Sequence, residues 1–285
     1  MEVAPGVHAI RAPVYEFLGL FAPNVYLVSG QAGALIDSGY SDGGLVRTSL
    51  EYVERLAPLK LGYIVITHPH PDHIGGCRTL REATGARVVM HSMAVERARD
   101  YGLTADILAE GGEILDLGGV TLELVYTPGH TSGNMCVYLR ESGVLFTGDH
   151  VVGVGTTVIE VPDGDMGRYV DSLRKLLNFS LYLICPGHGP VIRETERKIN
   201  ELIAHREERE QQVLGCLGRR RMTLSDLAGE IYPELDRRLS SLAEMQMLAH
   251  VDKLVREGRV SASGGAYRLK QRRGRHGPDA ERPAP

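Results

Sequence analysis

The sequence has few cysteines, no long hydrophobic run and no excess of positive charge, and each shortage excludes a class of protein. Its 285 residues include four cysteines, which are far apart and form no C-x-x-C pair, so neither a disulfide framework nor a thiolate zinc site is expected. Because no stretch of about 18 apolar residues is present, a transmembrane helix is not expected either. The formal net charge of -4 gives no overall basic field that would attract nucleic acid or an anionic membrane. Any site for a polyanion must therefore be local.

The beginning of the chain also lacks the pattern of an export signal. Residues 1–11 contain no charged segment followed by an apolar one, which a secretory signal would require. We therefore expect the protein to be cytoplasmic and to have no membrane partner. Hydrophobic residues make up 43% of the chain and charged residues 24%, the usual balance of a globular protein with a sizeable core.

The predicted elements are those of an α/β protein whose strands end in loops with histidine or aspartate. Apolar runs bounded by turn residues predict strands at 7–11, 24–29, 34–37, 63–66, 87–90, 120–126, 135–139, 144–146 and 181–185. Helical spacing of apolar residues predicts helices at 43–56, about 73–83 and 166–177. Several strands are followed at once by histidine or aspartate, so we expect a site built from strand ends.

The composition changes after residue 192. Residues 194–217 are rich in Glu, Arg and Gln, which is typical of a charged helix, so 193–221 is predicted to connect a catalytic domain at 1–192 to a second module. That module, 222–269, contains a short helix at 224–232 and a β-hairpin with a Gly-Gly turn, and it is predicted to be winged-helix-like. Its longer helix has an apolar stripe that we expect in the core: Leu242, Met245, Leu248, Val251, and Leu254 or Val255. Residues 270–285 have no apolar periodicity, and we expect a disordered tail.

The central motif is a group of histidines and one aspartate that directly follows the predicted strand 63–66. Residues 67–76 read Thr-His-Pro-His-Pro-Asp-His-Ile-Gly-Gly. Imidazole nitrogens and carboxylate oxygens are ligands that zinc prefers. A lone histidine is usually a surface or hydrogen-bonded core residue, but that explanation does not account for this group. Three further Gly- or Pro-bounded turns each present one more candidate ligand, namely His130, Asp149 and His188.

This order of motifs resembles the metallo-β-lactamase superfamily across residues 7 to 192. The resemblance implies an α/β fold, the αββα sandwich, with two Zn²⁺ per chain. It also implies a hydrolase that attacks with a metal-bridging hydroxide, which Asp72 would orient as the catalytic residue. By the same resemblance, the first zinc is bound by His68, His70 and His130, the second by Asp72, His73 and His188, and Asp149 bridges both. Asp37, Thr131 and Ser132 are candidates for hydrogen bonds to these ligands.

Further segments resemble the lactamase-beta-like subgroup, which ends in a winged-helix-like domain: 155–158, 169–173, 186–192 and 205–212. Animal members of this subgroup are endoribonucleases on single-stranded RNA, and fungal relatives hydrolyse acyl-carrier thioesters. True β-lactamases often have cysteine where Asp149 stands, so antibiotic hydrolysis is disfavoured. Three hypotheses remain: a zinc endoribonuclease for single-stranded RNA, a hydrolase of small thioesters of glyoxalase II or acyl-carrier type, and a winged-helix nucleic-acid-binding regulator with a vestigial metal site.

The winged-helix-like module has two interpretations of its own. The run Arg219-Arg220-Arg221 could contact nucleic-acid phosphates. The acidic residues Glu234, Asp236 and Glu244 near the would-be recognition helix favour instead a cap on the catalytic domain or a contact in a homodimer.

Overall fold

The computed structural model describes residues 1–11, 22–41 and 44–270. The chain divides into two compact units, with the boundary between Glu208 and Arg209. This boundary falls inside the segment predicted as a connector, and the residue limits of the predicted domains stay a prediction. The tail predicted to be disordered lies outside the described residues from position 271 onward.

The first unit contains two mixed β-sheets. Seven strands form one sheet in sequence order, antiparallel from β1 to β4 and parallel from β4 to β7. They are β1 (Glu2–Ala4), β2 (Val7–Arg11), β3 (Asn24–Ser29), β4 (Ala32–Ile36), β5 (Lys60–Val65), β6 (Arg87–His91) and β7 (Ile107–Ala109). The second sheet has the order β12-β11-β10-β9-β8, and only its β11–β12 pair is parallel. Its strands are β8 (Ile114–Asp116), β9 (Thr121–Tyr126), β10 (Met135–Leu139), β11 (Val144–Gly148) and β12 (Leu183–Pro186).

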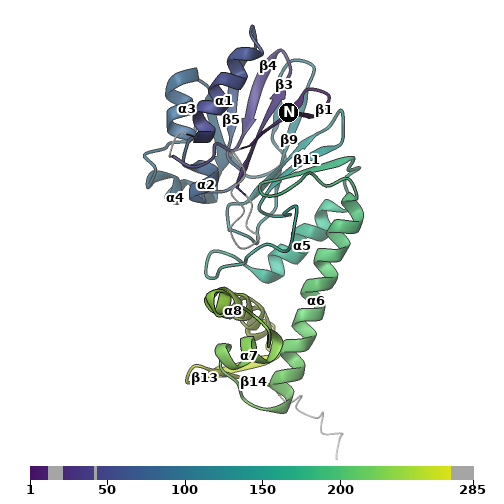
Figure 1. Ribbon diagram of the computed structural model, residues 1–285. Coiled ribbons are helices and arrows are strands. Elements are labelled where there is room, and N and C mark those ends of the chain that lie inside the picture. Colours follow the sequence, from purple (N-terminus) through teal and green to yellow (C-terminus); the bar gives the residue numbers. More distant parts are fainter. Residues whose placement is uncertain (12–21, 42–43, 271–285) are drawn as a thin grey trace, which may run out of the picture. The chain divides into compact units, whose positions relative to one another are not determined.

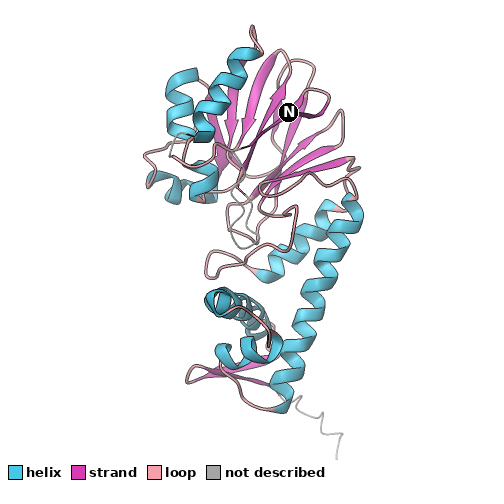
Figure 2. Cartoon of the chain, viewed as in Figure 1, coloured by secondary structure: helices cyan, strands magenta, loops and turns pink. Residues whose placement is uncertain are grey.

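The two sheets pack face to face over an apolar core. Alternate residues of both sheets contribute to it, and the rings of Tyr26 and Phe146, one from each sheet, lie 5.3 Å apart. A second core covers the other face of the first sheet, where α1 (Gly44–Arg55), α3 (Cys77–Thr84) and α4 (Val95–Arg99) pack. On the side of the second sheet lies α5 (Met166–Leu176), whose Lys175 donates to the carbonyl of Tyr126 at the end of β9. Figures 1 and 2 show these layers, and the predicted αββα sandwich is confirmed.

The prediction of one continuous helix at about 73–83 is wrong. The structure has a short helix α2 (Pro71–Ile74) and then α3, with a break at Gly75-Gly76. At this break the chain passes very close to the loop after β4, because a Cβ added at Gly75 would lie 2.8 Å from the backbone nitrogen of Ser41, and one at Gly76 would lie 2.5 Å from the carbonyl oxygen of Ser38. The two glycines therefore allow a close approach between loops rather than a continuous helix.

The second unit is a winged helix, as predicted. The long helix α6 (Thr195–Arg219) runs into it, followed by α7 (Leu224–Ile231), α8 (Ser240–Arg256) and the hairpin β13 (Val260–Ser263) and β14 (Ala266–Leu269). Met222 pairs with Tyr267 in a single bridge beside the hairpin. The predicted stripe of α8 is partly wrong, because its core face consists of Ala243, Met247, Val251 and Leu254, while Leu242, Met245 and Leu248 are only half-buried.

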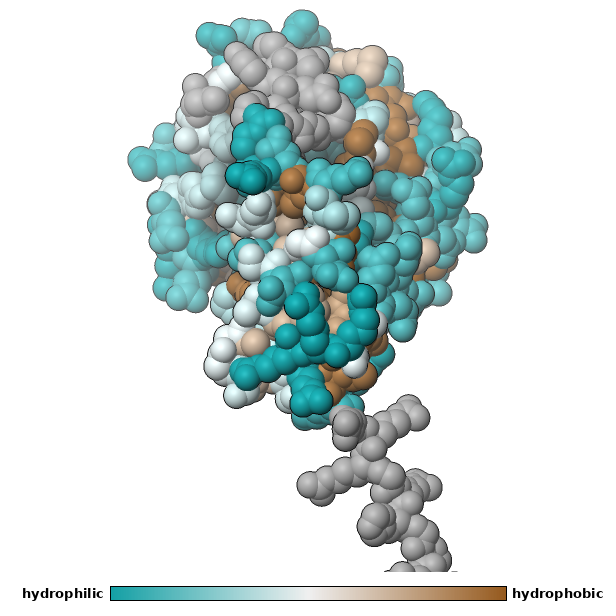
Figure 3. All heavy atoms as spheres, turned by 60° about the horizontal axis from the view of Figure 1, so that its bottom comes forward, coloured by the Kyte–Doolittle hydropathy of each residue, from teal (hydrophilic) through white to brown (hydrophobic). Residues whose placement is uncertain are grey.

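The surface gives one further observation. In Figure 3 hydrophilic residues cover most of the visible face, and hydrophobic residues form separate smaller areas. None of the helices in the described ranges is long and apolar enough to cross a membrane.

Candidate metal centre

Four loops at strand ends bring all seven predicted ligand residues together. The loop from β5 into α2 contributes His68, His70, Asp72 and His73, and the loops after β9, β11 and β12 contribute one residue each. The side chains form three groups in which the potential ligand atoms lie within 4.8 Å of one another: His68, His70 and His130; His68, His73 and Asp149; and Asp72, His73 and His188. The strand-end assembly expected from the sequence is therefore present.

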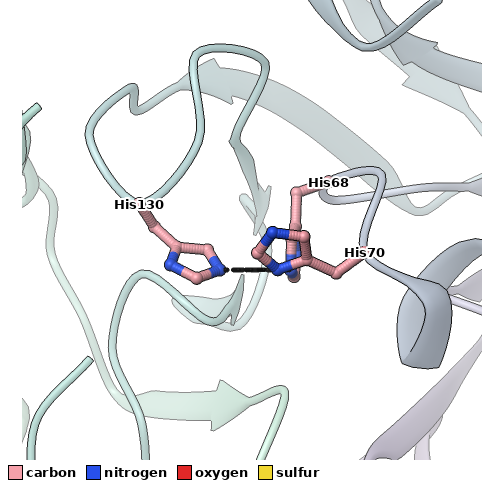
Figure 4. Close-up of side chains that lie close together, drawn as sticks. All are labelled: His68, His70 and His130. Atoms are coloured by element: carbon pink, nitrogen blue, oxygen red, sulfur yellow. Dashed lines mark hydrogen bonds between the residues drawn. The ribbon is translucent and has the colours of Figure 1, made fainter. Parts of the chain in front are cut away.

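Three imidazole rings converge in the first group, shown in Figure 4. Nδ1 of His70 lies 3.1 Å from Nε2 of His68 and 3.1 Å from Nε2 of His130. The two Nε2 atoms of His68 and His130 are 3.3 Å apart. We call these three residues the histidine group.

The other two groups share His73, and their two carboxylates, from Asp72 and Asp149, lie close to the imidazole of His188. Nε2 of His188 lies 3.0 Å from Oδ2 of Asp72, 3.4 Å from Oδ1 of Asp149 and 3.4 Å from Nε2 of His73. Oδ1 of Asp149 is 3.3 Å from His73, whereas its Oδ2 is 3.9 Å from His130. Asp149 thus presents one oxygen to each group. We call Asp72, His73 and His188 the mixed group.

Asp37 determines the tautomers of two of these histidines. Its buried carboxylate accepts from Nδ1 of His73 at 2.7 Å and from the hydroxyl of Thr67 at 2.9 Å. Since the only hydroxyl proton of Thr67 points to Asp37, its oxygen must accept from Nδ1 of His68, which lies 3.0 Å away. With Nδ1 protonated, the Nε2 atom of neutral His68 has a free lone pair that faces the histidine group.

The same reasoning applies to His130, whose Nδ1 lies 2.8 Å from the carbonyl of Val158. A carbonyl only accepts, so Nδ1 is protonated and Nε2 is a bare acceptor. Two lone pairs, on His68 and His130, thus face each other at 3.3 Å. Such an arrangement is repulsive unless a cation or a proton donor lies between the nitrogens. Oδ1 of Asp149 is also buried without a hydrogen bond of normal geometry in the described part of the chain. The donor atoms therefore fit a bound metal ion.

The protonation states of the histidine group suit a metal ligand set. Burial lowers the pKa of His68 well below its usual value, and the nearby charge of His73 lowers it further. Burial also lowers the pKa of His70 to about 4, and it lowers the pKa of His130. These rings are neutral at pH 7, and the converging Nε2 atoms of His68 and His130 have no proton to displace.

In the mixed group the pKa values of the histidines are raised instead of lowered. Burial opposes the charged form of His73, but the carboxylates of Asp149 and Asp37 outweigh burial and raise its pKa well above the usual value. The pKa of His188 is also raised, because the hydrogen bond to Asp72 and the charge of Asp149 outweigh burial. Without metal, protons therefore occupy the place that a cation would take.

This difference predicts a pH dependence of metal binding. Below the raised pKa values of His73 and His188, a metal must displace protons from the mixed group, so its affinity should fall by roughly tenfold per pH unit for each proton displaced. The lowered pKa values of the histidine group predict little change between pH 8 and pH 6. Competition titrations with Zn²⁺ at several pH values measure both slopes, and equal slopes at the two sites would contradict the assignment.

At two positions the ligand loops lie so close together that only glycine fits. A Cβ at Gly187 would lie 2.5 Å from Oδ1 of Asp149 and 2.7 Å from the ring of His73. Gly148, with φ +49°, would place a Cβ 2.3 Å from the hydroxyl of Thr67. Larger residues at either position would displace a ligand or its hydrogen-bond partner.

Of the three predicted hydrogen-bond partners of the ligands, Asp37 is in contact with them. Ser132 instead donates its backbone N–H to Asp163, and Thr131 has a buried hydroxyl without a partner among the described residues. Sequence reasoning missed the hydroxyl of Thr67 and the carbonyl of Val158 as partners. Thr67 could have been found from its place beside His68, but a backbone carbonyl 28 residues from His130 gives no sequence signal.

The fold and this cluster define an αββα-sandwich protein with a histidine- and aspartate-lined site able to bind metal. The model of the metallo-beta-lactamase superfamily matches residues 18–188, and that of the beta-lactamase associated winged helix domain matches residues 223–268. The chain therefore belongs to the metallo-beta-lactamase superfamily, whose members are generally hydrolases.

Curated relatives agree with this family, and solved structures have the same fold. The beta-lactamase-like protein 2 homolog of Caenorhabditis elegans is 32% identical over 241 residues, which cover 83% of this chain and 80% of the relative. The lactamase-like protein aptB of Emericella nidulans is 34% identical over 232 residues, covering 76% and 72%. In fold, the chain is similar to a metallo-beta-lactamase family protein of Thermus thermophilus, with a TM-score of 0.78 and 24% identity over 94% of this chain and all of that one. A beta-lactamase domain protein of Burkholderia ambifaria gives a TM-score of 0.81 with 23% identity over 95% and 93%.

Proposed function

We propose that this protein is a dinuclear zinc-dependent hydrolase. The observation that carries the proposal is the pair of donor sets that share Asp149, one oxygen facing each set. The histidine group would bind one zinc ion and the mixed group the other, with Asp149 between them. When bound, zinc lowers the pKa of water from 15.7 to about 7 and stabilises negative charge that develops on a substrate.

The chain's own residues have distinct roles in this reaction. Asp37 and the carbonyl of Val158 orient the imidazoles and keep their inner nitrogens free. The carboxylate of Asp72 lies at the mixed group and is partly exposed, at 17%. It can accept a hydrogen bond from the attacking water and direct that water to the substrate. His68 and His73 are fully buried, whereas the side chains of Asp72 and His188 are partly exposed.

We propose single-stranded RNA as the substrate. Support comes from exposed basic residues at one end of the winged-helix unit, where the pairing of Met222 with Tyr267 brings Arg221 and Arg268 into neighbouring positions. Such residues can bind phosphates of a single strand. Arg219 and Arg220 are also exposed, but each lies within 4 Å of a carboxylate oxygen of Glu230, which reduces their free positive charge.

A second candidate, hydrolysis of a small thioester, is favoured by a different observation. A pocket of about 520 Å³ lies beside the metal centre, between Pro69 and Ser132 of two ligand loops. Its charged lining consists of Arg97 and three carboxylates, from Glu96, Asp100 and Asp163, so its formal charge is negative. A negative pocket repels phosphates and suits an uncharged acyl group. The third hypothesis, a regulator with a vestigial site, has no such support because both donor sets are complete.

The test is a parallel assay of purified, zinc-loaded protein. The enzyme is tested at one concentration on four substrates: single-stranded RNA, S-lactoylglutathione, an acyl-carrier thioester and a β-lactam. Cleavage of RNA that weakens steeply with salt supports the first substrate, since phosphate contacts release counterions. Cleavage of a thioester with little salt dependence supports the second. Failure to bind two zinc ions per chain would refute the proposed metal centre itself.

Replacing His188 with alanine tests how the ligands are shared. We expect His188→Ala to lower zinc occupancy of the mixed group more than that of the histidine group, because the histidine group keeps its three nitrogens. Metal analysis and competition titration measure both sites. His8→Ala, at a histidine that contacts Tyr52 away from the centre, is the matched control. An equal loss at both sites would require a different partition of ligands.

A further inference from the structure

We propose that Arg206, on α6, is a positioning residue that keeps the loops of Asp149 and His130 in the geometry that metal binding requires. The inference rests on the proposed metal centre and adds a residue outside the proposed set of ligands. All residues involved belong to the first compact unit.

The segment 149–160 connects two of the ligands. The hydroxyl of Thr157 donates to the carbonyl of Asp149 at 2.7 Å. The next residue, Val158, accepts the hydrogen bond from Nδ1 of His130 at 2.8 Å. Two adjacent residues therefore determine the backbone position of one ligand and the ring orientation of another.

This segment has no regular structure of its own. In the described chain, residues 149–160 form neither helix nor strand. A loop without a backbone ladder can shift easily unless side chains fix it. The position of the Val158 carbonyl, and with it the tautomer of His130, thus depends on contacts from other elements.

Arg206 supplies such a contact at the centre of the segment. Its guanidinium donates to the carbonyl of Thr157 and is buried, with 3% exposure. It also lies over the ring of Tyr169 on α5, 5.3 Å from the ring centroid. The ring of Tyr169 also lies 4.8 Å from the ring of His150, directly after Asp149. Arg206 therefore supports the segment both at Thr157 and, through Tyr169, at His150.

Burying an arginine is costly unless its charge and its donors are used. A planar guanidinium can stack on a ring and donate in its own plane at the same time, which neither lysine nor methionine can do. The geometry thus explains why the helix places arginine here, on a face that is otherwise apolar through Leu202 and Ile203.

The experiment compares zinc affinity in Arg206→Met and Arg206→Lys with a matched control. Arg209→Met is that control, because Arg209 lies one turn further along α6 and also stacks on a tyrosine, Tyr232, at 4.4 Å, while its guanidinium donates to Gln212 on the same helix. Zinc dissociation constants come from competition titration of the full chain. The absorption spectrum of the Co²⁺-loaded protein reports ligand geometry, and thermal unfolding without metal reports stability.

We expect Arg206→Met to weaken zinc binding about 10–100-fold, as loss of a residue that orients ligands does, and to change the Co²⁺ spectrum. Arg206→Lys should show a smaller loss, and Arg209→Met should match the wild type in both. Unchanged affinity and spectrum in Arg206→Met would overturn the inference, even with a lower melting temperature. If Arg206→Met does not fold, Arg206→Lys is used instead, and unchanged zinc affinity and an unchanged Co²⁺ spectrum in that variant would overturn the inference. A wild type that binds no zinc would refute the proposed function instead.

Discussion

Asp72→Ala is expected to abolish nearly all turnover, by about 10²–10⁴-fold, the range for loss of a group that directs proton transfer. The carboxylate of Asp72 lies 3.0 Å from His188 and belongs to the mixed group. Its side chain is partly exposed, at 17%. The variant therefore loses a metal ligand and the acceptor that directs the attacking water. The rate on the substrate that the wild type cleaves is the measurement.

The fold should survive this change, because Asp72 lies on the surface of the short helix α2 and outside both hydrophobic cores. Circular dichroism and thermal unfolding check this point. Asp171→Ala is the matched control, since the side chain of Asp171 is 78% exposed and pairs only with Arg174 one turn away. Turnover close to that of the wild type in Asp72→Ala would contradict the role given to this carboxylate.

Asp37→Asn is expected to lower zinc affinity about 10–100-fold, although Asp37 is not itself one of the proposed metal ligands. The carboxylate accepts three hydrogen bonds, from the backbone and hydroxyl of Thr67 and from Nδ1 of His73. An asparagine has only one oxygen and must present its amide N–H groups to one of these donors. If the amide N–H group faces Nδ1 of His73, that nitrogen must accept, and the ring proton moves to Nε2, which would otherwise bind the metal. If the amide N–H group faces the backbone N–H of Thr67, two donors face each other and the hydrogen bond is lost.

Asparagine is the appropriate variant because Asp37 has φ 63°, a left-handed conformation that asparagine adopts more readily than alanine. Asp37→Ala would also remove the partner of a buried imidazole and should cost about 3–5 kcal/mol of stability. Zinc titration of Asp37→Asn, alongside Asp106→Asn at a surface salt bridge with Arg81, separates the two effects. Wild-type affinity in Asp37→Asn would show that the tautomers are determined elsewhere.

The ligand residues could be predicted from the sequence because the chemistry is local. Four of the seven lie within residues 68–73, and the others stand in Gly- or Pro-bounded turns after apolar runs. Strand ends of a sheet meet at one edge, so the sequence pattern already indicates a shared site. Their roles as ligands, with the number of zinc ions, remain predictions that metal analysis must test.

Other elements could not be read from the sequence, for identifiable reasons. The break between α2 and α3 depends on a loop more than 30 residues earlier, against which Gly75 and Gly76 pack. The core face of α8 was misplaced because Leu242 and Leu248 are as apolar as Val251, and periodicity alone cannot choose between adjacent faces of such a helix. The short strands β1, β7 and β8 were missed because three residues carry too little pattern.

By itself the sequence determined the superfamily, the αββα architecture, the winged helix and the side chains that gather at the candidate centre, because each leaves a pattern within a few neighbouring residues. Only the tertiary structure decided how those side chains are oriented and protonated. The tautomers of His68 and His73 follow from Asp37, and that of His130 follows from Val158, next to the Thr157 carbonyl that accepts from Arg206 on α6. These partners lie tens of residues apart along the chain. A hydrogen bond between distant segments is specified by how the layers pack, and no local pattern records it.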